Sequence, residues 1–135
     1  MIKVLLDTNI LVSAILNNRS VPYQALKKAL EPPCQGLICE QSIEELRRVF
    51  DRKFPEKISA FEHFIATAFP SVEIIPVPSF PYSEEKKIRD IDDRPILRSA
   101  VSAGADILLT GDKDFLESTV KCPKIMTAAQ FVKES

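Results

Sequence analysis

The sequence predicts an α/β fold in three layers, with a central parallel sheet of four or five strands between two layers of helices. Three observations support this prediction. Short apolar runs of strand length recur along the chain, segments with helical periodicity lie between most of them, and the first run is apolar on both faces. Because such strands must be covered on both sides, this alternation favours a parallel sheet with helices above and below it.

Five segments have the composition of strands. The first, residues 2–6, is aliphatic and β-branched and ends at an aspartate. The stretch from residue 70 to 82 contains four prolines, which cannot donate backbone hydrogen bonds, so we expect it to run extended at an edge of the sheet. The other strand-like segments are residues 36–39, 72–77, 106–110 and 124–126.

Capping residues mark where the helices should begin and end. Thr8 and Asn9 can cap a helix that follows the first strand. Pro95 suits the first turn of a later helix, which Gly104 would end. The segment 127–130 has the spacing of a capping box at the start of the last helix.

The composition is that of an ordinary globular protein. With 135 residues, 45% of them hydrophobic and 27% charged, and with no repeat or linker, one domain over residues 1–135 is expected. The apolar runs fall far short of the roughly 20 residues of a membrane helix, and no secretory signal precedes the first strand. We therefore expect a cytoplasmic protein without a membrane span. Its three cysteines lack the spacing of zinc or redox motifs and should be reduced.

The overall charge is close to neutral. There are 18 lysines and arginines against 19 acidic residues, a formal net charge of −1, which argues against binding nucleic acid through bulk charge. Any contact with RNA must come from local basic patches, although paired basic residues more often form a solvated helix face. The candidate patches are Lys27–Lys28, Arg47–Arg48, Lys53, and Lys86–Lys87 with Arg89.

Acidic residues stand where strands end, which is where open parallel sheets bind their ligands. Asp7 ends the first strand, Asp112 and Asp114 follow the strand at residues 106–110, and the acidic run 90–93 precedes the Pro95 helix. Clustered carboxylates repel one another unless a cation neutralises them, and carboxylate oxygens suit Mg²⁺ or Mn²⁺. One or two such ions activate water and stabilise the leaving oxygen in phosphodiester cleavage.

Each of these acids also has a purely structural interpretation. Asp7 could cap the first helix, and Asp92 or Asp93 could cap the Pro95 helix. Asp112 and Asp114 could form an Asx-turn beside Gly111. For any one residue this interpretation is at least as good as metal binding. Acids at three strand ends together favour a metal site, and a capping residue already faces the open end of the sheet.

One of two adjacent glutamates is a further candidate. The apolar residues of segment 43–50 define one helix face, which Glu45 flanks, whereas Glu44 points more nearly to solvent. Ser42 and Glu45 also have capping-box spacing, in which Glu45 would bond back to the Ser42 amide. If one glutamate reaches a central site, we expect it to be Glu45.

With these residues assembled, the sequence resembles the PIN-domain nucleases, and among them the VapC-like ribonucleases of toxin–antitoxin pairs. The resemblance covers nearly the whole chain and rests on the blocks MIKVLLDTNILVSAIL, SIEELRRVF and RDIDDRPILRSAVSAGADILLTGDKDFL. The last block is the most specific, because an acid, a helix, an Ala-Gly-Ala-Asp turn, a strand and TGDKDF follow one another in the family's order and spacing.

The resemblance implies roles for individual residues. Arg94 stands where some relatives carry another acid, so Asp92 could share the role of Asp93. Asp114 would be a further ligand or would position water. The implied metal ligands for one or two Mg²⁺ or Mn²⁺ ions are Asp7, Asp93 and Asp112, the further catalytic acids are Glu45 and Asp114, and the supporting polar residues are Asn9 and Thr110.

The function that the resemblance implies is metal-dependent endoribonuclease activity, as the toxin of a toxin–antitoxin pair. It implies an RNA substrate, a small antitoxin that blocks the acidic site, and a homodimer. The alternatives are a noncatalytic PIN-like module that binds RNA or protein, and a housekeeping RNA-processing nuclease. A haloacid dehalogenase phosphatase would need an aspartate in place of Asn9, and a receiver domain would need paired acids that residues 2–6 lack.

Overall fold

The computed structural model of the protein describes residues 1–134, which form alternating strands and helices. The strands are β1 (Ile2–Leu6), β2 (Cys34–Cys39), β3 (Val72–Ile75), β4 (Ile107–Leu109) and β5 (Lys124–Met126). The α-helices are α1 (Thr8–Leu16), α2 (Val21–Ala29), α3 (Glu40–Lys53), α4 (Ile58–Ala68), α5 (Arg94–Ser102), α6 (Lys113–Leu116) and α7 (Ala128–Lys133). Short 3-10 turns are η1 (Pro55–Lys57), η2 (Phe69–Ser71), η3 (Ser83–Lys87) and η4 (Ile91–Asp93).

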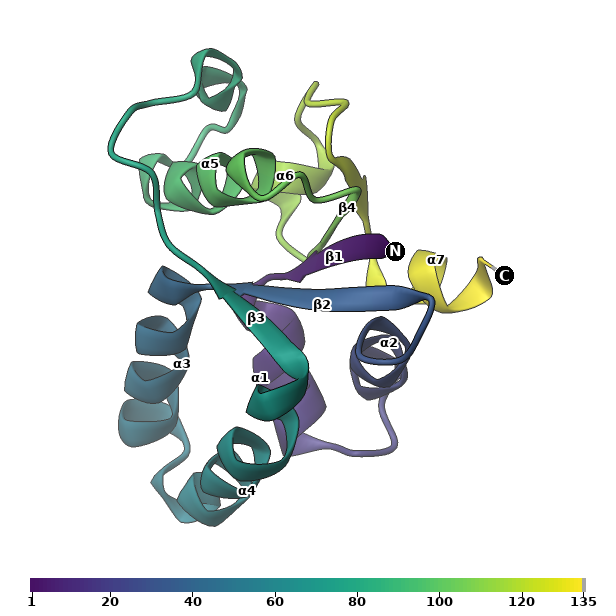
Figure 1. Cartoon of the computed structure of the whole chain (residues 1–135). Coiled ribbons are helices and arrows are strands. Elements are labelled where there is room, and N and C mark those ends of the chain that lie inside the picture. The colour runs from purple at the N-terminus through teal and green to yellow at the C-terminus, as the bar shows by residue number, and fades with distance from the viewer. Residues whose placement is uncertain (135) are drawn as a thin grey trace.

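The five strands form one parallel sheet in the order β3-β2-β1-β4-β5 (Figure 1). The chain begins in the middle of this sheet, builds outward to β3 on one side, and then returns to build β4 and β5 on the other. The order of strands therefore reverses at β1. At such a switch point the connections leave in opposite directions and open a crevice beyond the strand's carboxyl end. Asp7 is the first residue after β1.

Helices cover both faces of the sheet (Figure 1). The β1 strand shows why, because Val4 and Leu6 belong to the core shared with α1, α2, α3, α4 and α7, while Leu5 belongs to the core shared with α5 and α6. All three side chains are fully buried. This is the period-two pattern of a strand that packs on both faces. The predicted three-layer α/β/α fold with a parallel sheet of four or five strands is confirmed, with five strands.

The proline-rich stretch behaves as predicted. The β3 strand pairs only with β2, in parallel, and so lies at an edge of the sheet. It ends at Ile75, two residues earlier than the predicted segment, because Pro76 has no amide to continue the ladder. The β2 strand begins at Cys34, two residues earlier than predicted.

Several of the capping predictions are confirmed, since Pro95 lies in the first turn of α5 and the Asp7 side chain caps α1. Gly104 has a φ of 70° just after α5, and Thr127 forms the capping box of α7. The N-cap of α1 is Asp7, not Thr8 or Asn9, which are already helical. The capping box from Ser42 to Glu45 does not form, because β2 passes directly into α3 at Cys39 and leaves Ser42 inside the first turn.

Two other expectations concern the chain as a whole. Its three cysteines are free thiols, with Cys34 and Cys39 buried and Cys122 exposed. Within residues 1–134, no helix has both the length and the apolar character needed to cross a membrane.

Candidate active site

Asp7 occupies the switch point, with only 4% of its surface exposed. The Thr8 amide donates to its Oδ1 at 2.8 Å, and the Thr110 hydroxyl donates to its Oδ2 at 2.7 Å. The backbone amide of Asp7 donates to the Leu109 carbonyl at 3.0 Å, which ties the end of β1 to the end of β4. Both carboxylate oxygens are therefore held in fixed positions by neighbouring strand ends.

The electrostatic position of Asp7 is unfavourable for its charge. Burial raises the pKa of Asp7 to about 6, although the hydrogen bonds from Thr110 and Thr8 oppose the shift. The charges of Glu45 and Asp112 raise this pKa further. Within residues 1–134, Asp7 takes part in no salt bridge that would compensate its charge.

The loop after β4 carries Asp112 and the residues that orient it. The Asp112 amide donates to the Thr110 hydroxyl at 3.0 Å, and Asp112 Oδ1 accepts from the Asp114 amide at 2.9 Å. Asn9 Oδ1 accepts from the Gly111 amide at 3.1 Å, which joins α1 to the same loop. The predicted Asx-turn at Asp112 is therefore present. Asn9 and Thr110, the predicted supporting residues, both form hydrogen bonds that connect the end of β1 and the start of α1 to the end of β4.

Asp93 faces the same region from the start of α5. Although it occupies the N-cap position, its side chain makes no capping hydrogen bond, and the acid that bonds an amide here is Asp90, whose Oδ1 accepts from Asp92 at 2.9 Å. Asp93 Oδ2 is buried with no hydrogen-bond partner among residues 1–134. The cap interpretation of Asp92 or Asp93 is thus wrong. Burial, contact with the carboxyl of Asp112, and nearby acidic charges raise the pKa of Asp93 to about 8.

Glu45 reaches the site from α3. Its side chain is half-buried, whereas Glu44 is exposed, as the helical periodicity predicted. Burial raises the pKa of Glu45, and the charges of Asp92 and Asp90 add to the shift, while Gln41 and Arg48 oppose it. Because the Ser42 capping box does not form, Glu45 is not engaged in a structural cap.

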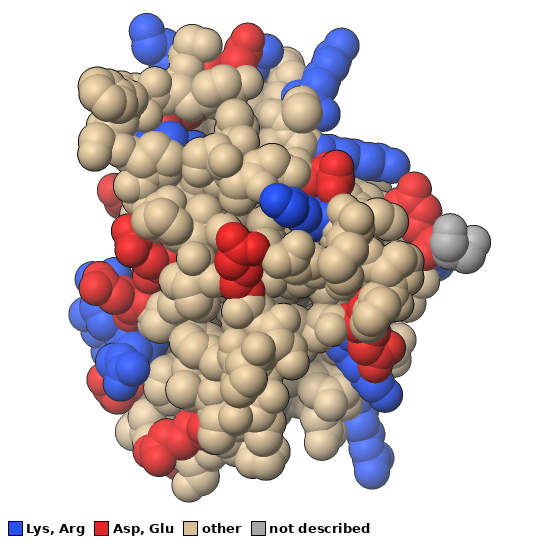
Figure 2. Space-filling view, viewed as in Figure 1, with Lys and Arg blue, Asp and Glu red and all other residues tan. Residues whose placement is uncertain are grey.

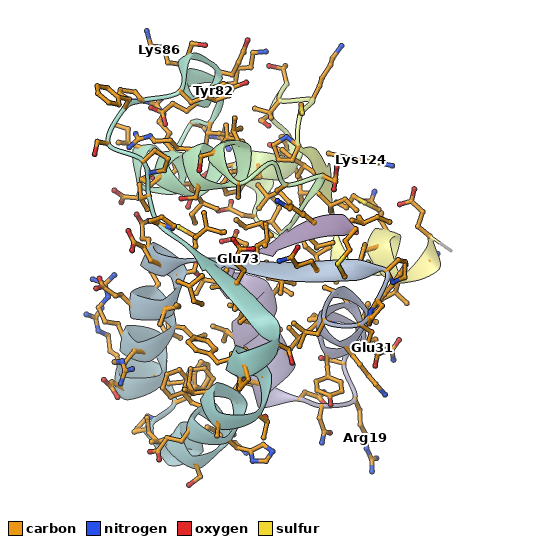
Figure 3. The ribbon with its side chains drawn as sticks, viewed as in Figure 1. Arg19, Glu31, Glu73, Tyr82, Lys86 and Lys124 are labelled. Atoms are coloured by element: carbon orange, nitrogen blue, oxygen red, sulfur yellow. The ribbon has the colours of Figure 1, made fainter. Side chains whose placement is uncertain are left out.

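These side chains line one open cleft of about 380 Å³ at the carboxyl end of the sheet. The structure brings together four of the predicted acids and one predicted support, namely Asp7, Glu45, Asp93, Asp112 and Asn9. A larger hollow of about 670 Å³ lies between α1, α2 and α4, and among the described residues its lining contains one carboxylate, Glu31, which is labelled in Figure 3. Because hard cations need several carboxylate ligands, the smaller cleft is the better candidate for a metal site.

Asp114 lies at the rim of the cleft, where it pairs with Arg89. The sequence did not predict this pairing. Arg89 donates from Nε to Asp114 Oδ1 at 2.8 Å and approaches the same oxygen with its terminal nitrogen at 2.5 Å. Among the described residues, Asp90, Asp93 and Asp114 each offer an oxygen within 4.8 Å of the others, which is close enough for the three to share one metal ion. That group differs from the predicted ligands Asp7, Asp93 and Asp112, with which it shares only Asp93.

The donor set fits a hard divalent cation. Every candidate ligand is a carboxylate oxygen, as Mg²⁺ and Mn²⁺ prefer. Asp93 Oδ2 is a buried oxygen without a hydrogen-bond partner among residues 1–134, and burial, together with nearby acidic charges, raises the pKa of both Asp7 and Asp93. A cation among these oxygens would coordinate Asp93 Oδ2 and would compensate the negative charge of both Asp7 and Asp93.

The fold and the acidic cleft define a class of α/β proteins with carboxylates gathered at a switch point. A family model described as the PIN domain matches residues 3–114, and the chain belongs to the PIN-domain family. It is similar to Uncharacterized protein MJ1680 of Methanocaldococcus jannaschii, with 29% identity over 118 residues, which is 85% of this chain and 74% of that protein. The predicted family is confirmed.

Solved structures with a similar fold come from toxin–antitoxin complexes. VapBC2 of Rickettsia felis, bound to a DNA fragment from its promoter, has a chain with a TM-score of 0.69 and 18% identity, covering 93% of this chain and 98% of its own. DNA-bound VapBC of Salmonella typhimurium has a TM-score of 0.66 and 19% identity, with coverages of 95% and 99%. A toxin–antitoxin complex from Klebsiella pneumoniae has a TM-score of 0.64 and 22% identity, with coverages of 93% and 97%.

Proposed function

We propose that this protein is a metal-dependent endoribonuclease that hydrolyses RNA phosphodiester bonds. The observation that carries the proposal is the convergence of Asp7, Glu45, Asp93 and Asp112 on one cleft, in a chain of the PIN-domain family. No cysteine or histidine lines this cleft, so a carboxylate site that binds a divalent cation is the chemistry its side chains best support. RNA as the substrate follows from the resemblance to VapC-like ribonucleases.

The proposed metal ligands are Asp7, Asp93 and Asp112, for one or two Mg²⁺ or Mn²⁺ ions. Such an ion, when bound, lowers the pKa of a water molecule and stabilises the leaving oxygen. The chain itself prepares the site, because Thr110 and the Thr8 amide hold the carboxylate of Asp7 in one orientation.

Glu45 and Asp114 have separate proposed tasks. A raised pKa makes a carboxylate a better proton acceptor, so Glu45 is suited to take a proton from the attacking water at a carboxylate oxygen. Asp114, held by Arg89 at the rim, would serve as a further ligand or would position water.

We further propose that the protein is the toxin of a toxin–antitoxin pair and acts in the cytoplasm as a homodimer. The support is the fold, which it shares with chains of three toxin–antitoxin complexes. A small antitoxin would bind over the acidic cleft. Expression of the chain alone should then arrest growth, and co-expression of the product of a neighbouring small reading frame should relieve the arrest. Growth unaffected by the active enzyme would favour a housekeeping nuclease.

Cleavage of a labelled RNA tests the enzymatic part of the proposal. The purified protein should cut the RNA when Mn²⁺ or Mg²⁺ is present and should stop when EDTA removes the metal. Glu62→Gln on α4, an exposed acid outside the cleft, should cut at the parental rate. A protein that binds the RNA but cuts nothing in either metal would be the noncatalytic module instead.

A further inference from the structure

A shallow groove of about 270 Å³ runs along α3 beside the acidic cleft. Its lining is Glu45, Arg48, Val49, Arg52 and Lys53. Three of these residues, Glu45, Val49 and Lys53, also line the acidic cleft. The spacing of the five residues places them on one face of the helix. The groove and the cleft are therefore continuous along this face.

The cations of this groove share its lining with one acid, Glu45, whose charge Arg48 partly compensates. Arg48, Arg52 and Lys53 are exposed, and none of them takes part in a salt bridge in the part of the chain that the structure describes. Arg47, one residue away, points elsewhere and lies 5.7 Å from the centre of the Phe61 ring. Figure 2 shows Lys and Arg side chains gathered among acidic ones along the left edge of the molecule, where Figure 1 places α3.

A structural explanation accounts for part of this cluster only. Arg52 and Lys53 lie in the last turn of α3, where a positive charge interacts favourably with the helix dipole. Arg48 lies outside that last turn, next to Glu45, and the dipole effect does not extend so far. Helix stability therefore does not explain why all three cations share the groove that leads into the acidic cleft.

The distances along the helix suit a chain of phosphates. With a rise of about 1.5 Å per residue, Arg48 lies roughly one turn and Arg52 roughly 10 Å beyond Glu45. A strand whose scissile phosphate lay in the acidic cleft would therefore pass its neighbouring phosphates over these guanidinium groups. Arginine is well suited to bind phosphate through paired hydrogen bonds.

We propose that Arg48, Arg52 and Lys53, here called the α3 basic track, bind the backbone of single-stranded RNA on one side of the scissile phosphate. The inference rests on the proposed function, because it takes the acidic cleft as the place of cleavage. RNA fits the groove better than a protein partner does, because Val49 is its only apolar side chain and protein interfaces need an apolar centre. The track also explains how a protein of net charge −1 could hold a polyanion beside an acidic site.

The test compares two double variants that each remove two positive charges. One is Arg48→Gln with Arg52→Gln. The matched control is Arg19→Gln with Lys124→Gln, two cations outside the candidate basic patches whose side chains lie far from α3 (Figure 3). Both are made in an Asp7→Asn background to prevent cleavage. Binding is measured by the fluorescence anisotropy of a labelled single-stranded RNA at several salt concentrations. An RNA of roughly 20 nucleotides is long enough to span the cleft and the groove.

The track variant should bind the RNA about tenfold or more weakly than its parent, and its salt dependence should fall. Each lost contact removes about 0.7 from the slope of log K against log salt for a single strand, so two contacts remove about 1.4. The control should keep the parental affinity and slope. In the cleaving protein, the track substitutions should raise KM and leave kcat unchanged.

Three results would overturn the proposal. The first is parental RNA binding and slope in the track variant, and the second is an equal loss in both variants, which would reflect overall charge. The third is unchanged RNA binding together with loss of binding to poly-glutamate, which would assign the face to an acidic protein. Because binding is measured without cleavage, a protein that cuts no RNA but binds it through the track would refute only the proposed enzyme.

Discussion

Asp7 and Asp93 face the same cleft but are held in different ways. Asp7 has a hydrogen-bond donor on each oxygen, and both donors are fixed by the ends of β1 and β4. Asp93 has a buried Oδ2 without a partner within residues 1–134 and lies against the carboxyl of Asp112. The pKa is raised to about 6 for Asp7 and to about 8 for Asp93.

The environments of Asp7 and Asp93 show that the two carboxylates are positioned by different means. Hydrogen bonds set the position of one carboxylate and partly stabilise its charge. The other carboxylate is brought in by η4 and α5 with no donor for its buried oxygen. We infer that the protein supplies the geometry and that a cation supplies the remaining charge compensation.

The largest expected effect comes from removing the fixed carboxylate. Asp7→Asn keeps the side chain's shape but removes one charge, so RNA cleavage should fall by orders of magnitude. Metal-free protein should melt at the parental temperature or slightly higher, because repulsion among the carboxylates is relieved. Mn²⁺ should raise the melting temperature of the parent more than that of the variant.

A helix cap alone predicts something different for this residue. Asn caps almost as well as Asp, so cleavage, stability and the response to metal would all stay parental. Asp7 does cap α1, and the two roles are therefore separated only by cleavage assays and thermal melts with and without Mn²⁺. Parental cleavage and a parental melting shift in Asp7→Asn would remove this residue from the metal site.

The next effect tests the acid that α3 contributes. Glu45→Gln should reduce cleavage by about 10² to 10⁴, the usual contribution of a general base. Glu44→Gln is the matched control, because Glu44 is exposed and outside the cleft, and it should keep most of the activity. Initial rates of both variants under one set of metal and RNA concentrations decide the point, and the reverse order would overturn the choice of glutamate.

A smaller effect should follow from loosening Asp7 without removing its charge. Thr110→Val deletes the donor to Asp7 Oδ2, so the pKa of Asp7 should rise further and the activity profile should move to higher pH. Loss of such a supporting contact costs about 10- to 100-fold in metal affinity or activity. Thr119→Val, at an exposed position, is the control. An unmoved pH profile would show that Thr110 does not tune this carboxylate.

The smallest effect is a pH dependence of stability in the metal-free protein. Asp7 and Asp93 have folded pKa values of about 6 and about 8, above the ordinary aspartate value of 3.8. At pH values between 3.8 and each folded pKa, the folded state binds more protons than the unfolded state. The free energy of unfolding should therefore fall as pH rises from about 4 to about 8. Urea denaturation in EDTA measures this slope. Asp93→Asn should flatten it, and a slope equal to the parent's would contradict the raised pKa.

The fold was predictable because burial leaves a plain pattern in the sequence. Residues 4–6 are three consecutive apolar residues, which indicated a strand covered by helices on both faces, and the prolines after residue 75 indicated an edge strand. Helical periodicity alone also favoured Glu45 over Glu44. These predictions depend on neighbours within one element, which the sequence order specifies directly.

The missed features depend on contacts between distant segments. Arg89 was identified only as a basic residue in a possible patch, yet it pairs with Asp114, 25 residues away, because the segment before η4 and the start of α6 lie side by side. The absence of the Ser42 capping box depends on β2 entering α3 without a loop, which the residue types do not reveal. The contact between Asp93 and Asp112 likewise follows from how two loops meet.

Anomalous scattering from a crystal soaked in Mn²⁺ tests the central claim most directly, since it locates the cation without relying on activity. We expect a peak in the cleft with oxygen ligands from both Asp7 and Asp93, at about the 2.0 to 2.2 Å typical of hard divalent cations. The Asp7→Asn protein should lose that peak or show it much weakened. A parent crystal at saturating Mn²⁺ with no peak in the cleft, or with a peak held only by Asp90 and Asp114 at the rim, would contradict a metal site built around Asp7.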